Sequence, residues 1–238
     1  DDLDALRVLV EVDLARRDFA AALDAVERLL VLAPDDAAAL ADRGRVLHEQ
    51  GQFAPAIASY EQSLARAPRD VDVLFNRALA LQKLERLGEA LQGFEHALAL
   101  APASIEARFA RANTLYMARR WSESLDEYER LLARHATHGG AWGNRGLVLH
   151  KLGRYEEAAD AAVATLRIQP DYIPGLRVSM VTSALAGRSD EARAHAARVM
   201  AKQPNISIAW LRAFLGVPLQ RNTKALEKYL EGARLAGI

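Results

Sequence analysis

A 34-residue period is the feature that most constrains the fold of this chain. Prolines recur at that spacing, or at twice it, at positions 34, 68, 102, 170 and 204. Small residues share the period at 22, 56, 90, 124, 158 and 192, and large residues share it at 19, 53, 87, 121 and 155. Self-similarity on this scale indicates a repeat architecture, in which each unit is one supersecondary element and neighbouring units share a core. The 238 residues correspond to seven units of 34.

Each unit is predicted to form two helices. In 37–70 the apolar and small residues recur in steps of three and four, which places them on one face of each helix. Gly51 separates the two helices because glycine readily adopts a left-handed conformation, and Pro68 ends the second helix. Gly153 and Gly187 occupy the place of Gly51 in later units. The residues that fill this place less easily are Arg17, Glu85 and Arg119.

Unit 139–172 carries the fullest motif. Its characteristic residues are Trp142, Gly146, Leu149, Tyr155, Ala158 and Pro170. A 34-residue helix–turn–helix with this pattern resembles the tetratricopeptide repeat (TPR) family. The resemblance implies an all-α fold, a right-handed α-solenoid of stacked antiparallel helix pairs. It predicts a single solenoid over 1–238 with repeats 3–36, 37–70, 71–104, 105–138, 139–172 and 173–206.

The last stretch, 207–238, is predicted to be a degenerate repeat that caps the apolar end of the stack. It keeps Trp210 at the characteristic place but is interrupted at 216–218 by Gly-Val-Pro. The sequence then predicts a helix from about Thr223. The residues expected on one side of it are Leu226, Tyr229, Leu230 and Ala233.

Composition excludes several classes of protein. The absence of cysteine rules out disulfide scaffolds, thiolate nucleophiles and cysteine-ligated zinc. Equal numbers of basic and acidic residues, 31 of each, argue against a nucleic-acid binder. The longest uncharged stretches, such as 178–187, reach only about ten residues, whereas a membrane span needs roughly 20. No membrane insertion is therefore predicted. Without an export leader the chain is expected to be cytoplasmic, although its start at Asp1 leaves export of a trimmed precursor open.

No catalytic or cofactor motif is present in the sequence. Walker-type loops, G-x-G-x-x-G, H-E-x-x-H and G-x-S-x-G are all missing. The glycine-dense segment 139–146 follows a helix rather than a strand, and its spacing is that of a repeat start. His135 and His138 lie three residues apart in a loop but lack further ligands nearby. We therefore expect no enzymatic activity, no metal and no cofactor.

The TPR resemblance implies that the first helix of each unit lines a concave groove. The predicted groove residues are Phe75, Asn76, Leu79, Gln82, Phe109, Asn113, Tyr116, Met117, Asn144, His150, Lys151 and Arg177. Exposed rings on such a surface mark interaction sites, and an asparagine amide both donates to and accepts from a peptide backbone. The alternative is that the rings pack between helices and that the amides only solvate the surface.

The function predicted from this groove is a non-catalytic protein–protein interaction module that binds a peptide or helix. Asn76 and Asn144 stand where O-GlcNAc-transferase-like arrays carry an asparagine ladder, although the ladder is incomplete here. A chaperone-type carboxylate clamp would use Asn113, Asn144 and Arg177, but its lysine is missing. The alternative is a regulatory or substrate-recruiting TPR part of a larger enzyme, glycosyltransferase-like or of the nucleotide-cyclase type.

Charge is distributed unevenly along the chain, which allows a further role as a self-assembling scaffold. Residues 1–36 have a net charge of −6, residues 37–172 of 0 and residues 173–238 of +6. Oppositely charged ends favour head-to-tail contact between copies, which is heterologous and can propagate. The predicted partners are thus a protein or peptide and, in the scaffold role, a second copy of the chain.

Overall fold

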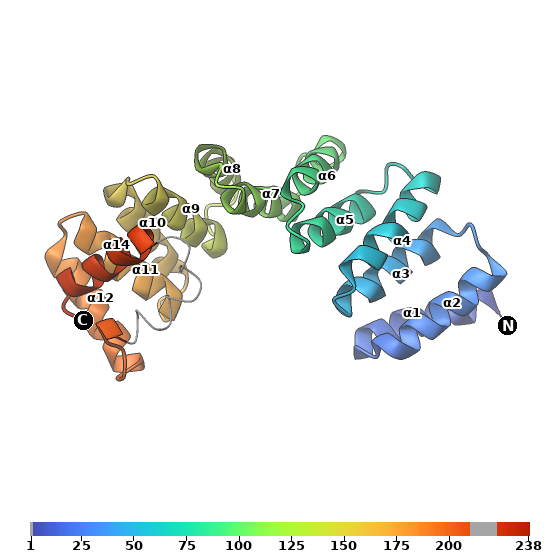
Figure 1. The fold of residues 1–238 in the computed structure, drawn as a ribbon, viewed down its shortest axis with the longest axis horizontal. Helices are drawn as coiled ribbons and strands as arrows, with labels where there is room; N and C mark the ends of the chain where they lie inside the picture. The colour runs from blue at the N-terminus through green and yellow to red at the C-terminus, as the bar shows by residue number, and fades with distance from the viewer. Residues whose placement is uncertain (1, 210–222) are drawn as a thin grey trace. The chain divides into compact units, whose positions relative to one another are not determined.

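The computed structural model describes residues 2–209 and 223–238, with the side chains of 223–226, 228 and 229 excepted. The regular structure of these residues is entirely helical. The first helices of the pairs are α1 (Leu3–Arg16), α3 (Ala37–Glu49), α5 (Val71–Lys83), α7 (Ile105–Met117), α9 (Gly139–Lys151) and α11 (Ile173–Leu185). The second helices are α2 (Phe19–Leu32), α4 (Phe53–Arg66), α6 (Leu87–Leu100), α8 (Trp121–Arg134), α10 (Tyr155–Ile168) and α12 (Ser189–Lys202), and α14 (Thr223–Leu235) comes last. The predicted all-α fold of stacked helix pairs is confirmed (Figure 1).

The chain divides into two compact units. The N-terminal unit is Asp1–Arg119, with α1 to α7, and the C-terminal unit is Arg120–Ile238, with α8 to α12 and α14. Within each unit, helices that follow one another in the chain pack side by side, for example α3 with α4 and α9 with α10 (Figure 1). The division falls between α7 and α8, inside the predicted repeat 105–138. The repeat boundaries and a single solenoid over 1–238 therefore stay predictions.

Short polar side chains fix the start of the first helices. The carboxylate of Asp36 accepts hydrogen bonds from the backbone N–H groups of Ala38 and Ala39, at 2.9 and 3.2 Å. Asp70 caps α5 and Ser104 caps α7 in the same way. Such side chains satisfy backbone donors that have no partner inside the helix. His138 performs this role for α9, because its Nδ1 accepts from the N–H of Ala141 at 3.0 Å.

The turn between the two helices of each pair contains one left-handed residue. The φ angles are +75° at Gly51, +76° at Gly153 and +80° at Gly187, as predicted. The other three turns hold Arg17, Glu85 and Arg119, with φ angles of 60°, 58° and 59°. A side chain in this region clashes with its own backbone, so these three turns carry strain that the glycine turns avoid.

Gly51→Ala is expected to lower the free energy of unfolding by about 1 kcal/mol. An added Cβ at Gly51 meets no atom within 4 Å, so the cost is purely conformational. Gly88→Ala in α6 is the matched control, since its Cβ also meets nothing within 4 Å but its backbone is helical. Because Gly88 is the second residue of α6, that change should stabilise the protein by less than about 1 kcal/mol. Urea denaturation followed by circular dichroism measures both, and a shift of the same sign would contradict the argument.

Small residues allow the two helices of a pair to pack closely. Tyr60 on α4 is only 1% exposed, and a Cβ added to Gly44 on α3 would lie 2.5 Å from its Cε1 atom. On α5 and α6, Ala78 faces Gly93, and a Cβ at Gly93 would lie 2.8 Å from that of Ala78. Neighbouring helices can approach this closely only where no larger side chain intervenes.

Helix α14 covers α11 in the C-terminal unit. Leu230 and Ala233 are buried in one cluster with Leu176 and Met180 of α11. A Cβ at Gly232 would lie 2.8 Å from Cγ1 of Val181 and 3.0 Å from its carbonyl oxygen, so the two helices are in close contact. The predicted positions of Leu230 and Ala233 on one side of this helix are confirmed. Trp210 and 216–218 lie outside the described residues, as do the side chains of Leu226 and Tyr229.

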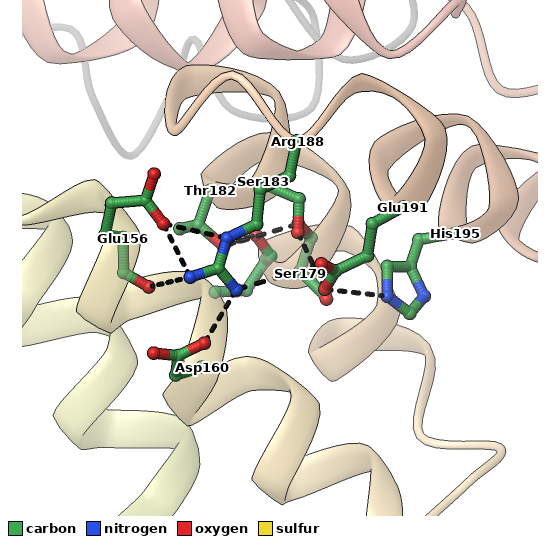
Figure 2. Close-up of polar contacts among 9 residues, drawn as sticks. Glu156, Asp160, Ser179, Thr182, Ser183, Arg188, Glu191 and His195 are labelled. Atoms are coloured by element: carbon green, nitrogen blue, oxygen red, sulfur yellow. Dashed lines mark hydrogen bonds and ion pairs between the residues drawn. The ribbon is translucent and has the colours of Figure 1, made fainter.

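A network of ion pairs around Arg188 ties α12 back to α10 (Figure 2). The guanidinium donates to Glu156 at 2.8 Å and to Asp160 at 2.6 Å, both on α10. Hydrogen bonds to Asp160 and Glu156 raise the pKa of Arg188 above its usual value. Arginines at the equivalent place in the three preceding pairs bind a glutamate of their own helix. These pairs are Arg86–Glu89, Arg120–Glu123 and Arg154–Glu157. Among these four arginines, Arg188 is the one whose ion pairs reach the preceding helix pair.

Candidate functional site

The predicted groove residues fall into two sets, one in each unit. The N-terminal surface consists of Phe75, Asn76, Leu79 and Gln82 on α5 and Phe109, Asn113, Tyr116 and Met117 on α7. The C-terminal surface consists of Asn144, His150 and Lys151 on α9 and Arg177 on α11. Helix α5 packs against α7 in the first set, and α9 packs against α11 in the second.

Phe75 belongs partly to the core of the N-terminal unit. Its ring lies 5.7 Å from the ring of Phe94, centroid to centroid, with the planes tilted by 58°. Phe75 and Leu79 are half-buried and both pack against the buried cluster that contains Phe94. Much of the Phe75 ring therefore packs between helices, which was the alternative to a role in binding. Only the remaining surface of the ring is available to a partner.

Gln82 connects the two helices of the N-terminal surface. Its Nε2 donates to Oγ1 of Thr114 at 2.7 Å, and that hydroxyl donates to the carbonyl of Ala110, also at 2.7 Å. The amide therefore holds α5 against α7. Burial raises the pKa of Tyr116 on α7, while Met117 beside it is 47% exposed. Met117 therefore offers an exposed apolar side chain at the end of α7.

His150 on the C-terminal surface packs against an aromatic ring. Its ring centroid lies 5.5 Å from that of Tyr155, which begins α10. His48 occupies the same repeat position and lies 5.3 Å from Phe53, the first residue of α4. Burial lowers the pKa of His48. Each of these two histidines therefore packs against the first residue of the second helix of its pair.

A cavity of about 60 Å³ lies between α9, α10 and α11 in the C-terminal unit. It is lined by Gly143, Asn144, Leu147, Ala162, Thr165, Tyr172, Pro174, Gly175 and Val178. Asn144 was predicted as a groove residue, whereas Gly143 and Ala162 were missed. A signal was available in the sequence, because the same two repeat positions hold Phe75 and Phe94 in 71–104.

A larger hollow of about 350 Å³ lies in the N-terminal unit beside Glu11, Arg17, Arg45 and Glu49. Its charges are mutually neutralised. Arg45 donates to Glu11 at 2.9 Å and to Asp42 at 2.8 Å. Burial raises the pKa of the Asp42 carboxyl despite this pairing. The hollow therefore presents an internally paired surface rather than a charge that requires a ligand.

Within 2–209 and 223–238, no three His, Asp or Glu side chains are arranged to hold a metal ion. His138, one of the two histidines considered for such a site, caps α9 instead. No helix among the described residues has the length and apolar character needed to cross a bilayer.

Stacked helix pairs with a 34-residue repeat of helix starts define a helical repeat protein. Sequence models described as tetratricopeptide repeat match residues 11–75, 71–104 and 109–173. The chain belongs to the tetratricopeptide repeat family. No curated protein sequence matches the chain.

Solved structures share this fold at low sequence identity. PilW, a type IV pilus biogenesis factor, is 17% identical with a TM-score of 0.75, and the match covers 86% of this chain and 95% of PilW. YrrB, a TPR protein with an unusual peptide-binding site, is 17% identical with a TM-score of 0.65, covering 77% and 94%. A tetratricopeptide repeat protein from Parabacteroides merdae is 16% identical with a TM-score of 0.74, covering 99% and 93%. At these identities the likeness concerns the fold alone.

Proposed function

We propose that this chain is a non-catalytic interaction module that binds a peptide on the first helices of its repeats. The observation that carries the proposal is the cavity beside Asn144. Asn144, Leu147 and Val178 all line it, and all occupy repeat positions that the TPR resemblance assigns to the binding surface. An apolar hollow next to an amide is a common arrangement for recognition, because the hollow takes a side chain while the amide orients the backbone.

The family and the fold support this proposal. The chain is a TPR protein, and YrrB, which has the same fold, has a peptide-binding site. The charged side chains around Arg188 form ion pairs between helices and so have a structural role. The other possibility, an accessory part of a larger enzyme, stays a prediction, as does the cytoplasmic location.

Selection of peptides from a random-sequence phage library on the immobilised full chain tests the proposal. Selected peptides should bind the wild-type protein and lose about tenfold in affinity to Asn144→Ala, the effect of one hydrogen bond to a peptide group. Asn205→Ala, at an exposed loop position after α12, is the matched control and should bind normally. Failure to select any peptide, or equal binding to both variants, would refute the proposal, provided that circular dichroism shows both proteins folded.

Self-association through α1 is a second candidate function. Val8, Leu9 and Val12 on this helix are 61%, 45% and 36% exposed. The described residues at the repeat position of Val12 in the following five pairs are buried: Val46, Ala80, Thr114, Val148 and Thr182. A second copy is the occupant that we propose for this face, because residues 1–36 carry −6 and residues 173–238 carry +6.

Light scattering at low salt and high concentration tests this second proposal. Oligomers should form and should dissociate as salt is raised, since exposed charges are screened beyond about 8–10 Å at physiological ionic strength. Val12→Glu should abolish them. A wild-type protein that stays monomeric at low salt would show that copies of the chain do not occupy the face.

A further inference from the structure

The repeats provide an internal reference for the cavity in the C-terminal unit. In 71–104, the ring of Phe75 on α5 lies against the ring of Phe94 on α6, 5.7 Å away. The residues at the same two positions of 139–172 are Gly143 on α9 and Ala162 on α10. The two rings that contact each other in 71–104 are therefore both missing from 139–172. The residues that replace them, Gly143 and Ala162, both line the cavity.

The surrounding residues do not fill this space. A Cβ added to Gly143 would have Oγ1 of Thr165, at 3.8 Å, as its nearest neighbour outside its own helix. Thr165 is 1% exposed, and its hydroxyl donates to the carbonyl of Ala161 at 3.0 Å. Its hydrogen-bond donor is therefore already satisfied within α10 and needs no ligand. On the α11 side the lining residues are Pro174, Gly175 and Val178. The cavity is therefore apolar in character, with Asn144 as a polar group at its edge.

Polar contacts hold two of the helices that form the walls, α10 and α11. Glu156 and Asp160 on α10 are bound by Arg188, the residue immediately before α12 (Figure 2). Ser183 of α11 donates to Glu191 of α12 at 3.1 Å, which attaches these two helices to each other. Because α10 and α11 are linked through Arg188 and α12, these two walls of the cavity are pre-organised. A pre-organised site loses less entropy when a ligand binds.

The charged residues of the two first helices beside the cavity are all basic. Neither α9 nor α11 contains an aspartate or a glutamate, whereas α5 contains Asp72 and α7 contains Glu106. Arg145 of α9 pairs with Glu129 of α8 at 3.0 Å. Lys151 and Arg177 add two further positive charges to the C-terminal surface. Charge complementarity therefore favours an acidic ligand.

We propose that the cavity between Gly143 and Ala162 takes an aromatic side chain from a partner peptide whose flanking residues are acidic. The ring occupies the volume that a pair of phenyl groups fills in 71–104, and Tyr172, which lines the cavity and is 45% exposed, supplies an aromatic contact. The Asn144 amide binds the peptide backbone. This inference rests on the proposed peptide-binding function and specifies the class of ligand.

Fluorescence anisotropy with labelled synthetic peptides tests the proposal on the full chain. The probe is acetyl-Asp-Glu-Phe-Glu-Asp-amide, and the comparison peptides carry leucine or alanine in place of phenylalanine. The phenylalanine peptide is expected to bind at least tenfold more tightly than either of the others. Its affinity should fall as salt is raised, because the acidic residues act through screened charges.

Filling the cavity should remove this binding. Ala162→Phe restores the residue found at this position in 71–104 and should weaken the phenylalanine peptide at least tenfold without lowering the thermal midpoint. Gly143→Leu fills the cavity from α9 and keeps the test decisive if Ala162→Phe does not fold. Gly88→Leu, at an exposed helical glycine of the N-terminal unit with open space around it, is the control and should bind normally.

Three results would overturn the proposal: folded cavity-filling variants that bind the probe as well as wild type does, equal affinity for the phenylalanine and alanine peptides, or no binding of the probe. The phage selection separates this failure from failure of the proposed function. If the probe does not bind but selected peptides bind in an Asn144-dependent way, the aromatic-pocket proposal is wrong and the peptide-binding function stands. If no peptide binds at all, both are wrong.

Discussion

Gly44→Ala is expected to lower the free energy of unfolding of the N-terminal unit by about 2–3 kcal/mol. The added Cβ would lie 2.5 and 2.6 Å from two carbons of the Tyr60 ring, and this ring is only 1% exposed. A buried ring in a close-packed core cannot swing away as an exposed side chain could. Helices α3 and α4 would have to separate, which would loosen the contacts between them.

Gly146→Ala is the matched control for this prediction, since Gly146 occupies the same repeat position on α9. Its Cβ would lie 3.5 Å from the Ala158 carbonyl oxygen and 3.6 Å from the Ala161 Cβ, which are ordinary contacts. Relief of the glycine penalty in a helix should therefore stabilise the C-terminal unit by about 1 kcal/mol.

The two units can be followed separately in urea denaturation. The three tryptophans of the chain all lie after residue 120, so their fluorescence reports the C-terminal unit, whereas circular dichroism reports both. Equal losses of stability in Gly44→Ala and Gly146→Ala would show that the ring of Tyr60 does not determine the cost.

The helix pairs could be predicted from the sequence because their signals are local and repeated. Gly51 and Pro68 act within a few residues of where they stand, and the left-handed turns at Glu85 and Arg119 followed from their alignment with Gly51. The division of the chain after Arg119 could not be predicted in this way. Residues on both sides follow the same repeat pattern, and the division depends on tertiary contacts that the pattern does not encode.

The candidate site was less predictable, because side chains from distant positions decide what each residue does. The repeat position of Phe75 is the same whether its ring faces a partner or the core. Its ring packs against that of Phe94, 19 residues later, and is therefore partly in the core. Gln82 is engaged by Thr114, which belongs to the next helix pair. The cavity was harder still to foresee, since Gly143 and Ala162 are unremarkable singly and become informative only when both are compared with 71–104.

Phe94→Ala is expected to lower the free energy of unfolding by about 3–5 kcal/mol. The ring is 0% exposed and lies against that of Phe75, so its removal leaves a hole that the surrounding helices cannot close. Phe75→Ala is the control, and because Phe75 is half-buried it should cost clearly less than Phe94→Ala. Urea denaturation followed by circular dichroism measures both variants.

The cost of Phe94→Ala also bears on the cavity beside Ala162, which occupies the same repeat position. The C-terminal unit already has alanine where the N-terminal unit has Phe94, together with Gly143 where the other has Phe75, and it retains a cavity there. Suppose that Phe94→Ala proves costly while Ala162→Phe stabilises the C-terminal unit. The pair Gly143 and Ala162 then makes the C-terminal unit less stable than two rings at the same positions would. Such a loss is typical of binding sites, where an open volume is needed for a ligand. If Phe94→Ala costs less than about 1 kcal/mol, the ring pair contributes little to packing, and its absence between α9 and α10 would have no bearing on a binding site.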